Sequence, residues 1–361
     1  MFHSFTAKNF RCFRKLTIDG LARVNLIVGK NNVGKTALLE ALFLILGPDN
    51  PDLPMRLNAL RGFQWFEAIP EEAWGWLFRN KRTEDTIELS TRLEGNERRD
   101  LRIRLSDPQG APLPSVGNGR RPSSTAVGSA TTAIGARELV LEYLDSGREP
   151  VVSRASLVAE AEGPRVRLSR PPVSGLPLGI YLTSALHNAQ ENAERFSKLQ
   201  EVGQEQEVLK PLRALEPRLQ RLVMAAPALG IPMMQGDLGI GRLVPLAFMG
   251  DGMGRLLSYM LAVAAARKGT VLIDEVENGL HYSVHQKTWN AIADFAGRFE
   301  TQVFATTHCD ECLRAAREAF ASRGADDFRV YRLDRVGEDT EAVMFTPDML
   351  ATAEATGLEV R

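Results

Sequence analysis

One eight-residue segment near the N-terminus has the residue types and spacing of a phosphate-binding loop. Residues 29–36 read GKNNVGKT and match the pattern G-x-x-x-x-G-K-[ST] in full. The glycines permit a tight turn whose backbone N–H groups point at phosphate oxygens, while Lys35 can reach the β- and γ-phosphates and the Thr36 hydroxyl can hold Mg²⁺. This pattern predicts a nucleotide site formed by Gly29, Asn31, Asn32, Gly34, Lys35 and Thr36.

Two adjacent carboxylates in the last third of the chain could supply a metal ligand and a base. Asp274 and Glu275 directly follow the apolar run 271–273. Two acids at the end of a buried strand are expected at the carboxyl edge of a parallel sheet, where ligands bind. Asp274 would then anchor Mg²⁺, directly or through water, and Glu275 would polarise the water that attacks the γ-phosphate.

The elements around these motifs are those that would position them. Residues 24–28 form a short apolar run typical of a buried strand, and residues 36–46 form an apolar helix that ends at Gly47 and Pro48. In the last third, segments with the apolar spacing of helices alternate with short apolar runs typical of strands, which indicates an α/β fold. We expect helices at 254–267, 282–299 and 309–322, and strands at 270–273, 302–305 and 328–333.

The middle of the chain has a different pattern. Residues 50–80 show no clear periodicity, and residues 107–136, rich in Pro, Gly, Ser, Thr and Ala, are typical of a flexible loop. Residues 184–224 carry apolar side chains at spacings of three and four, which predicts a short helical arm. An antiparallel β insertion is expected from the stretches 86–93, 100–105, 138–144, 151–159 and 165–168.

Five motifs together resemble one known family. They are NFRCF at 9–13, the phosphate loop, the segment 245–257, IDEVENGLH at 273–281 and FATTH at 304–308. The set is similar to an ABC-type ATPase of the RecF/SMC/OLD-like branch and, more narrowly, to the stand-alone bacterial AAA15-type ATP-binding proteins. The resemblance covers residues 1–80 and 240–335. It implies a P-loop NTPase fold of the ABC-ATPase type, a mixed sheet with helices.

The resemblance also assigns a role to the glycine-rich segment 249–253. It occupies the ABC signature position, with Gly252 lying 22 residues before Asp274. In this family the signature contacts the γ-phosphate of ATP bound to the other subunit, and a glycine turn before a helix N-terminus offers N–H groups and a positive dipole end to an anion. Gly250 stands where the signature commonly has Ser, so one hydroxyl contact is missing. The implied nucleotide contacts are Gly250 and Gly252.

Further residues match functional positions of the family by their place in the sequence alone. His308, 34 residues after Asp274, resembles the switch histidine that touches the γ-phosphate, although a histidine after a strand is also commonly structural. Arg11 is similar in position to a nucleotide-contacting arginine, with a sheet-surface arginine as the equal alternative. Residues 278–281 resemble the D-loop, which couples two sites across a dimer. The nucleotide-sensing glutamine is not identifiable, and Gln64 is the residue we consider for it.

These expectations divide the chain into four segments. The outer two form the halves of the ATPase core, and the inner two carry the insertions. They are residues 1–80 with the phosphate loop, 81–180 as the β-rich insertion with its loop at 107–136, 181–235 as the helical arm, and 236–361 with the signature, the Asp274-Glu275 pair, the D-loop and the switch histidine.

Composition excludes several classes of protein. The 44 basic residues against 45 acidic ones argue against a globally cationic nucleic-acid binder, and the excess of 35 Arg over 9 Lys is spread through the whole chain. No apolar run reaches the roughly 18 residues that span a bilayer. We therefore expect no membrane partner. Three cysteines cannot all pair with each other, which fits a reducing compartment, so we expect a cytoplasmic protein.

The resemblance implies Mg²⁺-dependent ATP binding and hydrolysis. Because the signature acts in trans, we expect a head-to-tail homodimer that closes on ATP and opens on hydrolysis. Its motion would regulate a partner, such as an effector protein encoded nearby, in antiviral defence or a toxin–antitoxin-like system.

The alternative function is that of a RecF-like DNA-binding ATPase in DNA repair or recombination. Arginines on or beside the β insertion could contact nucleic-acid phosphates. Acidic residues are mixed among them, so a solvated charged sheet face is the more ordinary interpretation. The arginines concerned are Arg92, Arg98, Arg99, Arg102, Arg104, Arg120 and Arg121.

Overall fold

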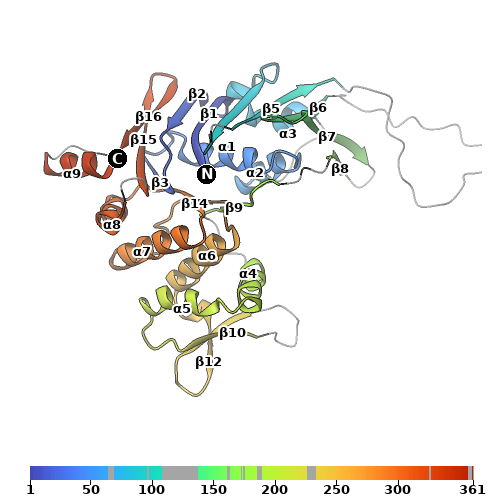
Figure 1. Cartoon of the computed structure of the whole chain (residues 1–361). Coiled ribbons are helices and arrows are strands. Elements are labelled where there is room, and N and C mark those ends of the chain that lie inside the picture. The colour runs from blue at the N-terminus through green and yellow to red at the C-terminus, as the bar shows by residue number, and fades with distance from the viewer. Residues whose placement is uncertain are drawn as a thin grey trace, which may run out of the picture.

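A six-stranded sheet lies at the centre of the molecule (Figure 1). The structure, a computed structural model, describes residues 1–63, 69–95, 97–107, 137–160, 163–171, 173, 175–184, 189–225, 233–324, 327–356 and 360. Five strands of this sheet are parallel, and the edge strand β16 is antiparallel to β15. In spatial order they are β16 (Asp339–Phe345), β15 (Phe328–Val336), β3 (Val24–Val28), β14 (Gln302–Thr306), β13 (Thr270–Ile273) and β9 (Gly179–Leu182).

The order of this sheet brings the two motifs together. Strand β14 pairs in parallel with both β3, which precedes the phosphate loop, and β13, which precedes Asp274. The carboxyl ends of β3 and β13 therefore meet at the same edge of the sheet, one strand apart. This confirms the expected parallel arrangement and the α/β fold.

A second sheet is wholly antiparallel. Strand β1 pairs with β4, so the N-terminal hairpin and the expected β insertion share one sheet. All the expected strands of this region are confirmed, whereas most of the loop expected at 107–136 lies outside the described residues. In spatial order the strands are β2 (Phe13–Asp19), β1 (Phe2–Phe10), β4 (Ile87–Leu93), β5 (Arg98–Ser106), β6 (Glu138–Asp145), β7 (Val151–Glu160) and β8 (Gly163–Ser169).

The two faces of β3 pack into two separate cores, since neighbouring side chains on a strand point to opposite sides. Ile27 packs into the core between the two sheets, whereas Leu26 packs into the core on the opposite face. The first core holds α1 (Lys35–Leu46), α2 (Leu53–Leu60) and α3 (Pro70–Trp74). The second holds α6 (Asp251–Ala265), α7 (Tyr282–Arg298), α8 (Asp310–Phe320) and part of α9 (Pro347–Ala355).

A small lobe of helices and strands packs against α6 at the end remote from the antiparallel sheet (Figure 1). The helical pattern at 184–224 is right for its first part and wrong for its last. After Arg213 the chain turns, and Val223 pairs with Gln235 in a strand, so the spacing of Leu219 and Leu222 belongs to a turn and a strand. The lobe contains α4 (Ala189–Glu201), α5 (Glu205–Arg213), β10 (Arg221–Ala225), β11 (Met233–Asp237) and β12 (Leu243–Pro245).

Short 3₁₀ turns are also present in the described part of the chain: η1 (Gly75–Leu77), η2 (Arg79–Lys81) and η3 (Leu246–Phe248). The expectation that residues 50–80 are irregular is wrong for the described part of this segment, since α2, α3, η1 and η2 lie there. These elements are short, and their helical turns are too brief to display a period. The antiparallel strand β16 and helix α9 at the C-terminus were also missed.

Candidate active site

The phosphate loop connects the end of β3 to the start of α1. Gly29 and Gly34 have φ values of +140° and +105°, which L side chains rarely adopt. A Cβ on Gly34 would also lie 2.7 Å from Phe13 Cε1 and 2.8 Å from Cys12 Sγ. Both glycines are therefore required by the backbone conformation that curls the loop over the N-terminus of α1.

Lys35 is held inside the curl of the loop. Its Nζ donates hydrogen bonds to the carbonyl oxygens of Gly29, at 2.6 Å, and Lys30, at 2.9 Å. Partial burial lowers the pKa of Lys35, while the negative charges of Glu277, Asp274 and Glu275 act in the opposite direction. The ammonium group is thus fixed on the concave side of the loop, where a phosphate anion would be stabilised.

Thr36 and Asp274 contact each other across the sheet edge. The Thr36 hydroxyl donates to Asp274 Oδ2 at 3.0 Å, and the Thr306 hydroxyl donates to Oδ1 of the same carboxylate at 2.6 Å. Asp274 is buried. A hydroxyl and a carboxylate beside a phosphate-binding loop are the oxygen ligands that Mg²⁺ takes in nucleotide sites, so the donor set fits this ion.

Glu275 adopts an unusual backbone conformation. Its φ is +52°, and its N–H donates to the Thr306 hydroxyl at 2.8 Å. A residue other than glycine in the left-handed region costs free energy and often occurs at functional sites. The turn places Glu275 on the wall of the cavity described next rather than in continuation of β13.

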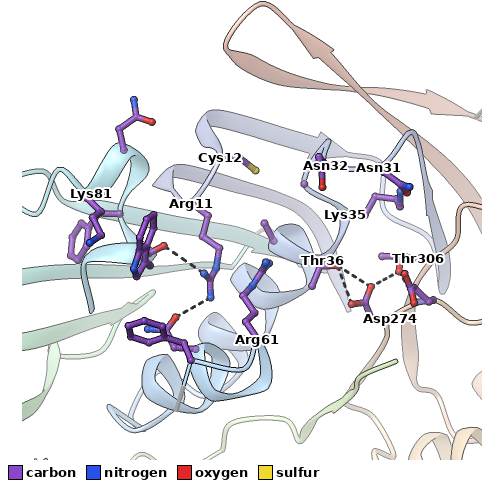
Figure 2. A pocket seen from close by; sticks show the side chains of 18 residues that line it. Arg11, Cys12, Asn31, Asn32, Lys35, Thr36, Arg61, Lys81, Asp274 and Thr306 are labelled. Atoms are coloured by element: carbon purple, nitrogen blue, oxygen red, sulfur yellow. Dashed lines mark hydrogen bonds between the residues drawn. The ribbon is translucent and has the colours of Figure 1, made fainter. Parts of the chain in front are cut away.

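A cavity of about 940 Å³ joins the two motifs. Its volume lies within the range of sites for small-molecule ligands. In Figure 2, Lys35, Thr36 and Asp274 lie at one end of it, and Arg11 lies between them and Lys81. Of the residues expected in the site, those that line the cavity are Arg11, Asn31, Asn32, Gly34, Lys35, Thr36, Asp274 and Glu275. Gly29 instead contributes its carbonyl oxygen, which accepts a hydrogen bond from Lys35.

Arg11 belongs to a partly buried ion cluster that the sequence did not reveal. Glu40, in the first half of α1, is only 1% exposed and pairs with both Arg11 and Arg61. Arg61 donates to its two carboxylate oxygens at 2.7 and 3.0 Å, a bidentate geometry. Burial lowers the pKa of Arg11, and the neighbouring Glu40 opposes that shift. The lone acid in the apolar stretch 37–46 was the available signal.

His308 lies outside the cavity lining, on the turn after β14. Glu277 Oε1 lies 3.0 Å from both its backbone nitrogen and its Nδ1. Glu277 is 9% exposed, whereas the His308 side chain is 53% exposed. Glu277 therefore fixes the turn and one ring nitrogen while the rest of the imidazole remains accessible. Glu277 was not predicted, although it stands two residues after Glu275.

The signature segment does not reach this cavity within the chain. Gly250 and Gly252 lie at the N-terminus of α6, and neither lines the cavity. Gly250 has φ +97° and is exposed, and the neighbouring Phe248 is 83% exposed. The D-loop residue Asn278 instead donates to the Ser184 carbonyl at 3.4 Å. Gln64 lies outside the described residues.

Comparisons with known proteins agree with this arrangement. The profile of the family described as "AAA domain, putative AbiEii toxin, Type IV TA system" matches residues 24–313. An ATP/GTP phosphatase of Helicobacter pylori is 25% identical over 327 residues, which are 87% of this chain and 86% of the relative. An uncharacterized protein of Methanocaldococcus jannaschii is 37% identical over 76 residues, which are 21% of this chain and 30% of that protein.

Solved structures show the same fold. The SmcHead bound to the C-winged helix domain of ScpA superposes with a TM-score of 0.53 over 97% of this chain and 99% of that one, at 11% sequence identity.

Among the described residues, no helix combines the length and apolar character needed to cross a bilayer.

Proposed function

The chain belongs to the family described as AAA domain, putative AbiEii toxin, Type IV TA system, and on this premise we propose that it is a Mg²⁺-dependent ATP hydrolase working as a head-to-tail homodimer. The fold that it shares with an SMC head, and its similarity to an ATP/GTP phosphatase, support an ABC-type ATPase of the RecF/SMC-like branch. The observation that carries the proposal is the set of hydrogen bonds joining Thr36, Asp274 and Thr306 beside Lys35.

In this proposal the phosphate loop binds the nucleotide. The backbone N–H groups of the loop, including those of Asn31, Asn32 and Gly34, face the phosphate oxygens, and Lys35 neutralises their charge. Arg11 adds a second positive charge further along the same cavity. Thr36 and Asp274 would hold Mg²⁺, which when bound would neutralise charge on the terminal phosphates.

Glu275 is the proposed general base. It lies on the cavity wall next to Asp274, where its carboxylate can accept a proton from the water that attacks the γ-phosphate. His308 would contact the γ-phosphate from the adjacent turn. Gly250 and Gly252 would act on the nucleotide of a second copy, because their exposed turn offers helix N-terminal N–H groups to an anion outside this chain.

Phosphate release from Mg²⁺–ATP tests the catalytic assignment. We expect the Glu275→Gln variant to bind ATP with unchanged affinity and to hydrolyse it at least about 100-fold more slowly, as for the loss of a general base. Glu318→Gln, an exposed glutamate on α8, is the control and should keep the wild-type rate. An inactive wild-type protein, or a Glu275→Gln variant with full activity, would overturn the proposal.

The finer biological role is also a proposal. The description of the family names a toxin–antitoxin system, which supports regulation of a partner such as an effector encoded nearby, in antiviral defence or a toxin–antitoxin-like system. Copurification of the neighbouring gene product with the Glu275→Gln variant, with and without ATP, tests this. A partner that binds equally in both states would argue against nucleotide-controlled regulation.

The RecF-like alternative gains no specific support from the described arginines. Arg98 pairs with Asp100, and Arg99 pairs with Asp145, so part of the positive charge of this sheet is compensated locally. Arg120 and Arg121 lie outside the described residues. A gel shift with ATP at two salt concentrations decides between the two functions, since absence of DNA binding at low salt would eliminate the alternative.

A further inference from the structure

The cavity extends well beyond the phosphate loop. Besides the residues described above, its lining includes Phe63, Trp76, Phe78, Asn80 and Lys81, none of which belongs to a recognised motif of the chain. Figure 2 shows Lys81 on the far side of Arg11 from Thr36 and Asp274, and Lys81 lies over the Trp76 ring. A ligand whose phosphates sit at Lys35 would therefore reach past Arg11 into a compartment that contains Lys81 and Trp76.

Trp76 has the properties of a ligand contact rather than of a core residue. Its side chain is 52% exposed, whereas the neighbouring Trp74 is fully buried. The backbone around Trp76 is anchored to the β1–β2 turn, because Arg11 N–H donates to the Leu77 carbonyl at 2.8 Å. The indole ring is thus presented to the cavity from a fixed segment.

Lys81 adds a positive charge to the same compartment. Its Nζ lies 4.2 Å from the centre of the Trp76 ring, a cation–π contact, and 3.2 Å from Glu72 Oε2. Asn80 and Lys81 have φ values of +54° and +56°, two consecutive non-glycine residues in the left-handed region. Such a conformation costs free energy and is common at ligand sites.

We propose that this compartment, centred on Trp76, is the nucleobase subsite and that it accepts both purines. The inference rests on the proposed nucleotide-hydrolase function. Every base has a π-face, so stacking on an aromatic side chain attracts bases with little discrimination. The ammonium group of Lys81 is a donor only, and adenine and guanine both present an N7 acceptor. Pyrimidine nucleotides lack N7 and the second ring, and bind more weakly here.

Binding measurements on the full chain test the subsite. We expect similar dissociation constants for Mg²⁺–ATP and Mg²⁺–GTP and a larger one for Mg²⁺–CTP. The substitution Trp76→Ala should weaken ATP and GTP about tenfold or more, as for the loss of one stacking contact, and leave inorganic tripolyphosphate unaffected. Trp76→Phe should retain most of the affinity. Ile240→Ala, at an equally exposed apolar side chain outside the cavity, is the control.

The outcomes separate this inference from the function on which it rests. If Lys35→Ala abolishes ATP binding while Trp76→Ala leaves it within twofold, only the base subsite is wrong. If Trp76→Ala weakens tripolyphosphate as much as ATP, the ring has a structural role and the inference also fails. If the wild-type chain binds no nucleotide, the proposed function fails first.

Tryptophan fluorescence provides a second readout that does not depend on the alanine variant folding. We expect ATP and GTP to change the emission of the wild-type protein and to produce a much smaller change in Trp76→Phe, although that variant still binds both nucleotides. An identical change in the two proteins would overturn the inference, because the signal would then come from one of the other three tryptophans.

Discussion

The phosphate end of the cavity and the signature turn at 249–253 differ in how much of their chemistry is satisfied within one chain. At the phosphate end, Lys35 donates a hydrogen bond to the Gly29 carbonyl and Thr36 donates one to Asp274. All three side chains line the same cavity. At the signature turn, Gly250 is exposed, no heavy atom lies within 4 Å of a Cβ built on it, and Phe248 is 83% exposed.

This difference is what a site divided between two subunits would show. In such a site, the half that would bind nucleotide is pre-organised by internal contacts, whereas the half that would complete it faces outward in the single chain. In a symmetric dimer the same two surfaces meet twice, so each chain would supply one phosphate loop and one signature turn.

The largest effect is expected at the phosphate end. Lys35→Ala removes the charge that the loop carbonyls hold in place, and we expect ATP affinity to fall at least 100-fold, beyond detection by calorimetry at micromolar protein. Lys30→Ala, an exposed lysine of the same loop, is the control and should change affinity less than about threefold. Equal effects of both substitutions would mean that only the net charge of the loop matters.

At the signature turn we expect loss of turnover without loss of binding. Gly252→Asp places a negative charge where the γ-phosphate of the other subunit would lie, and a Cβ there meets only ordinary contacts at 3.4 Å or more. Hydrolysis should fall at least tenfold while ATP affinity stays unchanged. Gly297→Asp, at an exposed position near the end of α7 where an added Cβ meets open space, should leave both unchanged. A Gly252→Asp variant that loses ATP binding would contradict action in trans.

Mixing the two inactive variants sharpens this test. A mixed dimer of Lys35→Ala and Gly252→Asp chains contains one intact composite site, formed by the phosphate loop of one chain and the signature of the other. Random mixing should therefore restore about a quarter of the wild-type rate. No recovery after proven exchange of subunits would argue against the shared site.

A smaller effect is expected at Glu277, which holds the turn after β14. Its Oε1 accepts from the backbone N–H of His308 and lies 3.0 Å from Nδ1 of the same residue, so Glu277→Gln should leave ATP affinity unchanged and lower kcat several-fold. If His308→Ala abolishes turnover while Glu277→Gln keeps the wild-type kcat, the contact between the two side chains has no catalytic importance.

The sequence predicted the parts of the site that depend on local pattern. The phosphate loop and the Asp274-Glu275 pair each follow an apolar strand, and parallel pairing then brings them together without further information. The prediction of a helical arm is wrong at its end, because the leucine spacing at 212–222 fits a helix as well as the turn and strand that form there. Long-range pairing of β10 with β11 decides the matter, and spacing cannot report it.

The missed residues share a different property. Glu40 and Arg61 lie 21 residues apart, and Glu277 and His308 lie 31 apart, so each contact exists only after folding. Trp76 resembles Trp74 in sequence, yet one is exposed to the cavity and the other is buried. Residue type alone does not identify these contacts, because each partner comes from another element of the fold.

The molecular mass of the Glu275→Gln variant tests the divided site most directly. Light scattering after size exclusion, with and without Mg²⁺–ATP, reports whether nucleotide brings two chains together. We predict a single chain without nucleotide and a mass twice as large with ATP, a change that Lys35→Ala in the same chain prevents. A Glu275→Gln variant that binds ATP and remains a single chain would contradict the account.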